Sequence, residues 1–290
     1  MDELLDSMTC PTTLNFRGRL LSLDKPLVMG ILNLTPDSFS DGGRFTDEES
    51  AMSRISEMLE EGADIIDLGA ASSRPGASPV AVEEEWNRLC AVVGKALANF
   101  PDAIFSVDTY RSQVASKALE LGVHAINDIS GGRLDPAMIP LVAKYRNVPY
   151  FIMHMRGNPA TMQSMTDYGP DVVAGVMQEL RERILECREA GMVDLVVDPG
   201  FGFSKTLEQN YALLRNLHQI KAFRVPLLVG ISRKSMVYKV VGGTPDSVGD
   251  LTAALHFQAL EHGANILRVH DVKETVRLVK LHRFWKYGIV

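Results

Sequence analysis

The sequence predicts a closed (β/α)8 barrel of the TIM-barrel class, and two patterns support this prediction. Eight short apolar runs recur along the 290 residues, and segments with helical spacing of apolar residues lie between them. The runs are apolar in succession rather than alternating, which suits parallel strands buried on both faces. Eight strands that alternate with helices are enough to close a barrel. An open, doubly wound sheet is the structural alternative, because strand count alone does not prove closure.

The predicted elements follow one another without a linker. A hairpin over residues 13–25, with Gly18 between two alternating stretches, is expected to close the floor of the barrel. Strands are expected at 26–33, 63–69, 103–109, 123–129, 148–154, 193–199, 225–232 and 264–271. Helices are expected at 50–62, 82–100, 112–122, 171–191 and 251–263. Four of these five helices end at or just before a Gly that can cap them. We therefore expect one domain over residues 1–290.

The composition argues against several classes of protein. The chain has 30 Lys and Arg against 36 Asp and Glu, and no block of like charges marks a nucleic-acid footprint. Cys10, Cys90 and Cys187 are odd in number and far apart, which indicates free thiols and a reducing compartment. The first residues, MDELLDSM, are acidic and unlike a signal peptide, and no apolar run is long enough to span a membrane. We expect a cytoplasmic protein whose partners are neither nucleic acids nor membranes.

Polar side chains follow all eight predicted strands. In barrels of this class the site is built at the carboxyl ends of the strands. The side chains there are Asn33; Ser72, Ser73 and Arg74; Asp108; Asn127 and Asp128; His154; Asp198; Ser232, Arg233 and Lys234; and Arg268, His270 and Asp271. Loops are polar in most proteins, but an acid, amide or base on the last residues of a strand costs free energy if it is left unpaired.

Two kinds of ligand group fit this set. A flat heterocycle with adjacent N–H donors can pair with carboxylates and amides, because a carboxylate accepts two parallel hydrogen bonds. The candidates for that edge are Asp108, Asn127 and Asp198. Phosphate or diphosphate fits the donors and positive charge that come from the first and last strands, which are neighbours in a closed barrel. These residues are Asn33, Arg268 and His270.

Two local motifs resemble a phosphate loop and a metal site, but their spacing argues against both. DPGFGFSKT (198–206) lacks the Walker spacing, because Ser204 precedes Lys205, so a nucleotide P-loop is not expected. His154 in FIMHMRG has no second His four residues on and no Cys pair nearby, which favours a hydrogen-bonded histidine in the site wall over a metal ligand. The Met residues beside it are expected to line a pocket for a flat ring.

Together these stretches resemble the dihydropteroate synthase family from residue 13 to about 285. The matching stretches, in the family's order, are MGILNLTPDSFSDGGRF, DIIDLGAASSRPGA, VDT, INDISGG, FIMHMRG, DPGFGFSKTLEQNYALLRNL, GISRKS and LRVHDV. The resemblance implies an alkyl transferase of folate biosynthesis that condenses 7,8-dihydropterin-6-ylmethyl diphosphate with 4-aminobenzoate, giving 7,8-dihydropteroate and diphosphate. It also implies Mg²⁺, a homodimer formed through barrel helices away from the site, and sulfonamides as mimics of aminobenzoate.

The resemblance assigns site residues by position. The pterin-binding positions are Asp108, Asn127, Met153, Asp198, Lys234 and Arg268. The diphosphate positions are Asn33, Arg268 and His270, and Asn33 is also the implied Mg²⁺ ligand. The aminobenzoate positions are Phe39, Ser73, Arg74, Pro75 and Ser232. The catalytic positions are Asp41, Lys234, Arg268 and His270.

The implied chemistry needs no protein nucleophile. In the family the C–O bond to diphosphate breaks first, in an SN1-like step, and leaves a cation delocalised over the pterin. Mg²⁺, Arg268 and His270 then stabilise the leaving charge, while Asp41 offsets the cation. The polar run after the first strand is expected to be a mobile lid that excludes water, with Asn33 as its anchor and hinges at Gly42 and Gly43.

Three positions depart from the commoner family form. Ala71 and Ser73 stand where GGESTRPGA has Glu and Thr, so an acid and a methyl group are lost on the aminobenzoate side. Ser204 stands where FGFGK has Gly, and a positive φ there would cost about 1 kcal/mol. None of the three removes a pterin or diphosphate ligand.

Two other functions remain open. A pterin domain of a corrinoid-dependent methyltransferase shares the barrel, but it would have no use for the diphosphate set of Asn33, Arg268 and His270. A non-catalytic relative that binds pterin without turnover is harder to separate, because every inferred ligand is present in this sequence.

Overall fold

Eight parallel strands form one sheet in the computed structural model, which describes residues 11–34, 44–71 and 80–289. The strands are β3 (Leu27–Asn33), β4 (Ile65–Gly69), β5 (Phe105–Asp108), β6 (Ala125–Asp128), β7 (Tyr150–Met153), β8 (Leu195–Asp198), β9 (Leu228–Val229) and β10 (Ile266–Val269). Their order around the sheet is β8-β7-β6-β5-β4-β3-β10-β9.

The sheet closes between β8 and β9. Val197 and Leu227 form a parallel bridge, and the amide of Val197 donates to the carbonyl of Pro226 at 2.9 Å. The predicted barrel is thereby confirmed over the open sheet. The seam strand β9 is only two residues long although the apolar run extends over 225–232. Pro226 has no amide hydrogen for the ladder, and the chain turns away after Val229.

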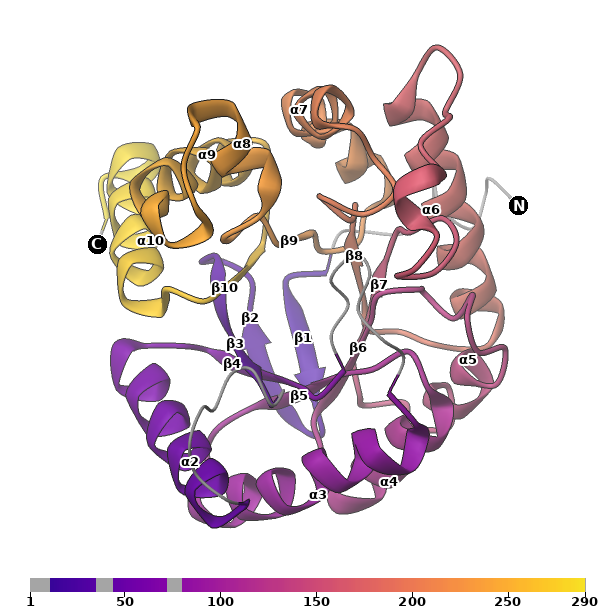
Figure 1. The fold of residues 1–290 in the computed structure, drawn as a ribbon, viewed down its shortest axis with the longest axis vertical. Coiled ribbons are helices and arrows are strands. Elements are labelled where there is room, and N and C mark those ends of the chain that lie inside the picture. Colours follow the sequence, from indigo (N-terminus) through magenta and orange to yellow (C-terminus); the bar gives the residue numbers. More distant parts are fainter. Residues whose placement is uncertain (1–10, 35–43, 72–79, 290) are drawn as a thin grey trace.

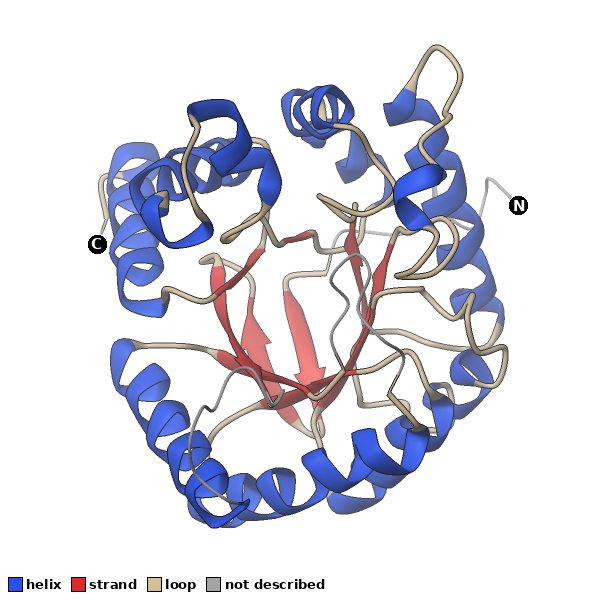
Figure 2. Ribbon diagram, in the orientation of Figure 1, coloured by secondary structure: helices blue, strands red, loops and turns tan. Residues whose placement is uncertain are grey.

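A ring of helices surrounds the strands (Figures 1 and 2). The helices are α2 (Arg44–Glu61), α3 (Val82–Asn99), α4 (Ser112–Leu121), α5 (Met138–Val142), α6 (Val172–Glu189), α7 (Leu207–Arg215), α8 (Ser235–Val241), α9 (Gly249–Glu261) and α10 (Val272–Tyr287). Three 3-10 turns are η2 (Met162–Ser164), η3 (Leu217–Phe223) and η4 (Pro245–Ser247). No helix of the described ranges is both long and apolar enough to cross a membrane.

The five predicted helices are confirmed, but one starts earlier and others were not predicted. Helix α2 begins at Arg44, inside the polar run that was expected to be loop. The unpredicted α5, α7 and α8 have five, nine and seven residues, too few for a clear helical period. Helix α10 was missed because its apolar residues do not share one face, and Phe284 and Trp285 lie exposed on it.

The predicted hairpin lies across the floor of the barrel. Strands β1 (Thr13–Phe16) and β2 (Arg19–Ser22) pair antiparallel (Figure 2). Leu14 and Phe16 are fully buried, and the ring of Phe16 meets that of Phe151 edge-on at 6.4 Å between centroids. The floor cluster consists of Leu14, Phe16, Leu27, Met29, Ile65, Ile104, Ala125, Phe151, Val196, Leu228 and Ile266. This apolar plug leaves the opposite end, the mouth, for polar side chains.

Candidate active site

A guanidinium held between two carboxylates lies at the mouth. Arg268 of β10 donates through Nε to Oδ2 of Asp67 and through Nη2 to Oδ2 of Asp108, both at 2.7 Å. Asn127 of β6 donates through Nδ2 to the same Asp67 oxygen at 2.9 Å. Four strands, β4, β5, β6 and β10, therefore converge on one polar cluster, because the carboxyl ends of parallel strands meet at the same edge.

Burial and pairing oppose each other in this cluster. Burial raises the pKa of Asp108, and the Arg268 guanidinium opposes that rise. Burial also acts to lower the pKa of Arg268, but the neighbouring Asp67 and Asp108 outweigh it and raise that pKa. Two carboxylates that share one guanidinium leave a surplus of negative charge, which suits a ligand that presents N–H donors.

Asp198 and Lys234 meet beside Arg268. A Cβ atom at Gly230 would lie 3.8 Å from Nζ of Lys234, 3.9 Å from Oδ2 of Asp198 and 3.8 Å from Cβ of Arg268, so the three side chains converge on that glycine. The other oxygen of Asp198 accepts the amide of Gly200 at 2.7 Å. Burial raises the pKa of Asp198 and lowers that of Lys234 to about 8, and each group counteracts the shift of the other.

An apolar wall adjoins these charges. Its buried members are Ile129, Met153, Met155, Met162 and Phe203. Met153 lies at the end of β7 in register with Asp198. A flat ring whose edge paired with Asp198 would therefore have thioether and aromatic surface within reach of its face.

A cavity of about 510 Å³ opens between the ends of β3 and β10 and helices α2 and α10. Asn33, Arg54, Arg233 and His270 contribute to its lining. A Cβ atom at Gly69 would lie 3.7 Å from Oδ1 of Asn33 and 3.7 Å from Oδ2 of Asp108. Asn33 thus joins the cavity to the aspartate cluster.

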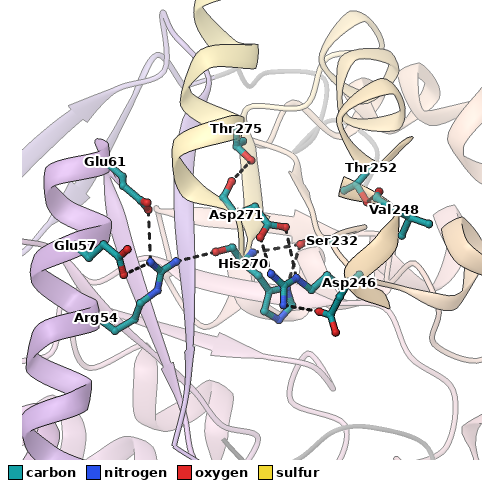
Figure 3. A network of polar contacts seen from close by, with 11 residues as sticks. Arg54, Glu57, Glu61, Ser232, Asp246, Val248, Thr252, His270, Asp271 and Thr275 are labelled. Atoms are coloured by element: carbon teal, nitrogen blue, oxygen red, sulfur yellow. Dashed lines mark hydrogen bonds and ion pairs between the residues drawn. The ribbon is translucent and has the colours of Figure 1, made fainter. Parts of the chain in front are cut away.

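His270 is held from two sides of this cavity (Figure 3). Its Nδ1 lies 3.0 Å from Oγ of Ser232, and Arg54 of α2 donates through Nη2 to its backbone carbonyl at 3.0 Å. Arg233 pairs with Asp271 at 2.6 Å and with Asp246 at 3.0 Å, so Asp271, which follows His270, is held in place as well.

The predicted site residues divide into three groups. Those that the structure brings together at the mouth are Asn33, Asp108, Asn127, Met153, Asp198, Ser232, Lys234, Arg268 and His270. Those that lie outside the described residues are Phe39, Asp41, Ser73, Arg74 and Pro75, with the hinge glycines Gly42 and Gly43. Asp128 belongs to the fold instead, because Tyr150, Ser130 and Gly132 donate to its carboxylate.

The structure adds residues that the sequence reading missed. Asp67 lies inside its strand rather than at the strand exit, where the site was expected, although a charge inside the run DIIDLG is itself a signal. Lys205 was considered only for a phosphate loop. Arg54 resembles any solvated helix residue, and no pattern distinguishes it. Within the described ranges, no group of three or more His, Cys, Asp or Glu side chains could hold a metal.

Fold and site together define a (β/α)8-barrel enzyme whose mouth presents paired carboxylates and cations to a small ligand. A family model described as "Pterin binding enzyme" matches residues 29–270. The dihydropteroate synthase of Escherichia coli K12 is 43% identical over 267 residues, covering 91% of this chain and 93% of its own. That of a Synechocystis strain is 42% identical over 258 residues, covering 88% of each. The chain belongs to the dihydropteroate synthase family of pterin-binding enzymes.

Solved structures agree with this assignment. Dihydropteroate synthase of Xanthomonas albilineans with 4-aminobenzoic acid has a TM-score of 0.88 at 39% identity, over 95% of this chain and 98% of that one. The same organism's enzyme in complex with 7,8-dihydropteroate has a TM-score of 0.85 at 37% identity, over 95% and 99%. The Yersinia pestis enzyme in a sulfonamide complex has a TM-score of 0.87 at 41% identity, over 94% and 99%. The resemblance seen in the sequence is confirmed.

Proposed function

We propose that this protein condenses 7,8-dihydropterin-6-ylmethyl diphosphate with 4-aminobenzoate to give 7,8-dihydropteroate and diphosphate. The observation that carries the proposal is the set of buried and half-buried charges at the mouth, with Arg268 between Asp67 and Asp108 and with Asp198 beside Lys234. The relatives and solved structures that bear the name dihydropteroate synthase support it.

The pterin would bind by its polar edge and its face. The carboxylate of Asp198 can accept two adjacent N–H groups, and Asn127 and Lys234 supply an amide and a cation for the remaining ring heteroatoms. Met153 would contact the ring face. Because the carboxylates and Arg268 are already paired, they need no rearrangement when the ligand arrives, which is what electrostatic catalysis requires.

Bond breaking would follow this binding. The C–O bond breaks with its electron pair remaining on diphosphate, and the positive charge spreads over the pterin. Arg268 and His270 would stabilise the leaving charge, with Asn33 beside Asp108 at the edge of the cavity. The aniline nitrogen of 4-aminobenzoate then forms the new C–N bond and loses a proton.

Mg²⁺ fits this end of the site as an ion that arrives with the diphosphate. Mg²⁺ prefers oxygen ligands, keeps several waters and is commonly bound through one or two protein groups together with substrate phosphates. Asn33 offers such an oxygen beside the cavity, next to Asp108. When bound, Mg²⁺ would neutralise part of the charge on the leaving group.

The aminobenzoate side is proposed from the family positions. Phe39, Ser73, Arg74 and Pro75 would receive aminobenzoate, and Asp41 would face the cation. Ser232 would join them from the β9 exit. Since the Yersinia pestis relative forms a sulfonamide complex, we propose that sulfonamides compete for the same side.

We also propose a homodimer through residues 281–287 at the C-terminal end of α10, whereas the N-terminal end of this helix lines the cavity. Leu281, Phe284, Trp285 and Tyr287 are each more than half exposed there, and α10 lies in the outer helix ring (Figure 1). Large apolar side chains gathered in this way are typical of subunit contacts. Trp285→Glu should convert the dimer to a monomer in sedimentation velocity, and a wild-type chain that sediments as a monomer would contradict the proposal.

We further propose a single domain and a cytoplasmic location. One barrel domain over 1–290 is supported by the strands of the eight-stranded sheet, which run from Leu27 to Val269. A cytoplasmic location is supported by Cys90 and Cys187, which are free thiols in the described part of the chain, since disulfides form mainly in oxidising compartments.

Synthesis of dihydropteroate is the direct test. The purified protein is mixed with dihydropterin diphosphate, Mg²⁺ and labelled 4-aminobenzoate, and labelled dihydropteroate is measured, with Asp198→Asn as the inactive control. Pterin binding without product would identify a non-catalytic relative. Methyl transfer from a methylfolate, without dihydropteroate formation, would identify the corrinoid-linked alternative.

A further inference from the structure

Below the pterin side of the mouth lies a buried lysine with no part in the proposed chemistry. Lys205 is 4% exposed, and its Nζ lies 2.9 Å from the carbonyls of Gly200 and Phe203 and 3.0 Å from Nδ1 of His154. An ammonium has three protons and no lone pair, so these three acceptors match it one for one. Burial lowers the pKa of Lys205 to about 7, and Asp198 counteracts the shift.

The match favours one tautomer of His154. When Nδ1 accepts from Lys205, the ring proton is on Nε2, which lies 3.3 Å from Oε2 of Glu179 without a hydrogen bond to it. Burial and Lys205 lower the pKa of His154 to about 3, so the ring is neutral and free to accept. Glu179 in turn pairs with Arg156 at 2.6 Å and with Arg133 at 2.8 Å. A series of polar groups therefore leads from Lys205 outward through His154 and Glu179 to two arginines.

The neighbouring residue makes a second connection between the β7 and β8 exits. Ser204 has φ +47°, a region where a side chain costs about 1 kcal/mol and where the commoner family residue is Gly. Its Oγ accepts the amide of Arg156 at 3.0 Å and lies 3.3 Å from the hydroxyl of Tyr168. Ser204 therefore costs backbone strain, and its hydroxyl joins the β7 and β8 exits.

The segment held in this way carries the pterin-binding groups. Lys234 donates to the carbonyl of Phe201 at 2.6 Å and lies 4.8 Å from the centre of the Phe203 ring. Lys205 binds the carbonyls of Gly200 and Phe203, on either side of Phe201. Two lysines, one buried below the loop and one at the mouth, therefore fix the same turn that follows Asp198.

We propose that Ser204 and Lys205 are positioning residues for the pterin pocket, which tie the loop over residues 199–203 to the β7 exit and so hold Asp198 and Lys234 in the geometry that binds the pterin edge. The proposal deepens the proposed function and rests on it. Both residues act through their neighbours.

Lys205→Met is the main test, because Met has similar length and no donor. The affinity for dihydropterin diphosphate, measured by calorimetry, should fall about tenfold, as expected for a displaced binding group. The KM for 4-aminobenzoate and the kcat at saturating pterin should change less than about twofold. Lys144→Met, at an exposed lysine, is the matched control and should change none of these.

Equal loss for both substrates, with a lower melting temperature, would show a merely structural role and overturn the proposal. Pterin affinity within twofold of wild type would overturn it too. Wild-type protein that gives no heat with dihydropterin diphosphate would instead reject the proposed function, so the two failures are distinguishable.

Ser204 provides a second pair of variants should Lys205→Met not fold. Ser204→Ala loses the hydroxyl and keeps the strained φ, whereas Ser204→Gly loses the hydroxyl and relieves the strain. Both should weaken pterin binding by the same factor of about three, as for one lost hydrogen bond, while the Gly variant melts higher. Unchanged pterin affinity in both would overturn the role of the hydroxyl.

Discussion

The floor and the mouth of this barrel are built by the same strands, from positions two residues apart, but one is apolar and the other is charged. Ile65 and Asp67 follow each other on one face of β4, and Ile266 and Arg268 do so on β10. Successive residues on one face of a strand occupy successive layers of a barrel. The lower layer is an apolar cluster, while the upper layer holds buried charges.

This difference separates stability from function by one layer of side chains. Apolar burial below contributes free energy of folding, whereas burial of charge above is at best neutral unless each group is paired. Variants in the two layers should therefore fail in different ways.

Asp198→Asn should abolish detectable pterin binding, with a loss of about 100-fold or more, because it removes the charged partner of the N–H edge and of Lys234. Calorimetry with dihydropterin diphosphate measures this loss of affinity. The matched variant is Val196→Ala, one layer down on β8, which should lower the melting temperature and leave pterin affinity within about twofold. Unchanged affinity in Asp198→Asn would contradict the assignment of this carboxylate as the partner of the pterin N–H edge.

Arg268→Ala should reduce kcat more than it reduces pterin affinity, with about a 100-fold loss of turnover, because the guanidinium stabilises the leaving charge. Some affinity should also be lost, since Asp67 and Asp108 both rely on it. Arg268→Lys should recover little, because an ammonium cannot bridge two carboxylates as the planar fork does. Equal losses of kcat and affinity would argue against the leaving-group role.

Arg54→Met should lower kcat about fivefold without changing pterin affinity, because the carbonyl of His270 loses its donor and the imidazole moves relative to the cavity. Steady-state kinetics with both substrates measure this. Glu57→Gln is the control, since Glu57 pairs with the same arginine at 2.5 Å but does not touch His270. If both variants behave alike, Arg54 acts through α2 rather than through His270.

Lowering the pH should destabilise the fold through one histidine near the floor and one near the mouth. Turnover at neutral pH should not depend on their titration. Burial lowers the pKa of His124, near the floor, to about 4, and burial and Lys205 lower that of His154, near the mouth, to about 3. The unfolded chain therefore binds protons first as pH falls below about 6.5, and each histidine removes up to about 1.4 kcal/mol of stability per pH unit.

Urea midpoints at pH 7 and pH 5 measure this dependence. His124→Gln keeps an acceptor for the amide of Phe105, which His124 now supplies through Nδ1 at 3.2 Å, and removes the titration. Its midpoint should therefore fall less on acidification than that of the wild type. An equal fall would show that His124 does not contribute.

The strands and the polar exits were predictable because local chemistry determines them. A parallel strand buried on both faces is an unbroken apolar run, and five helices showed the 3.6-residue period. Pairings across the barrel were not predictable in the same way. Arg268 meets Asp67 and Asp108 across separations of 201 and 160 residues, and only the register of four strands brings them together.

Residues that act through others gave no local signal. Lys205 stands in a polar loop, and its three acceptors come from the fold of that loop and from β7. The cost predicted for Ser204 did apply, since φ is positive there, but the hydroxyl contacts that offset it depend on Arg156 and Tyr168, far away in the sequence.

The shared guanidinium couples three positions, because Asp67 and Asp108 both pair with Arg268. Losing Asp67 or Asp108 removes one of the two partners of Arg268, and losing Arg268 leaves one buried and one half-buried carboxylate without their cation. An inhibitor anchored on this trio would leave the enzyme few routes to resistance, because loss of Arg268 strips two carboxylates of their cation and loss of either carboxylate removes one of the two partners of Arg268.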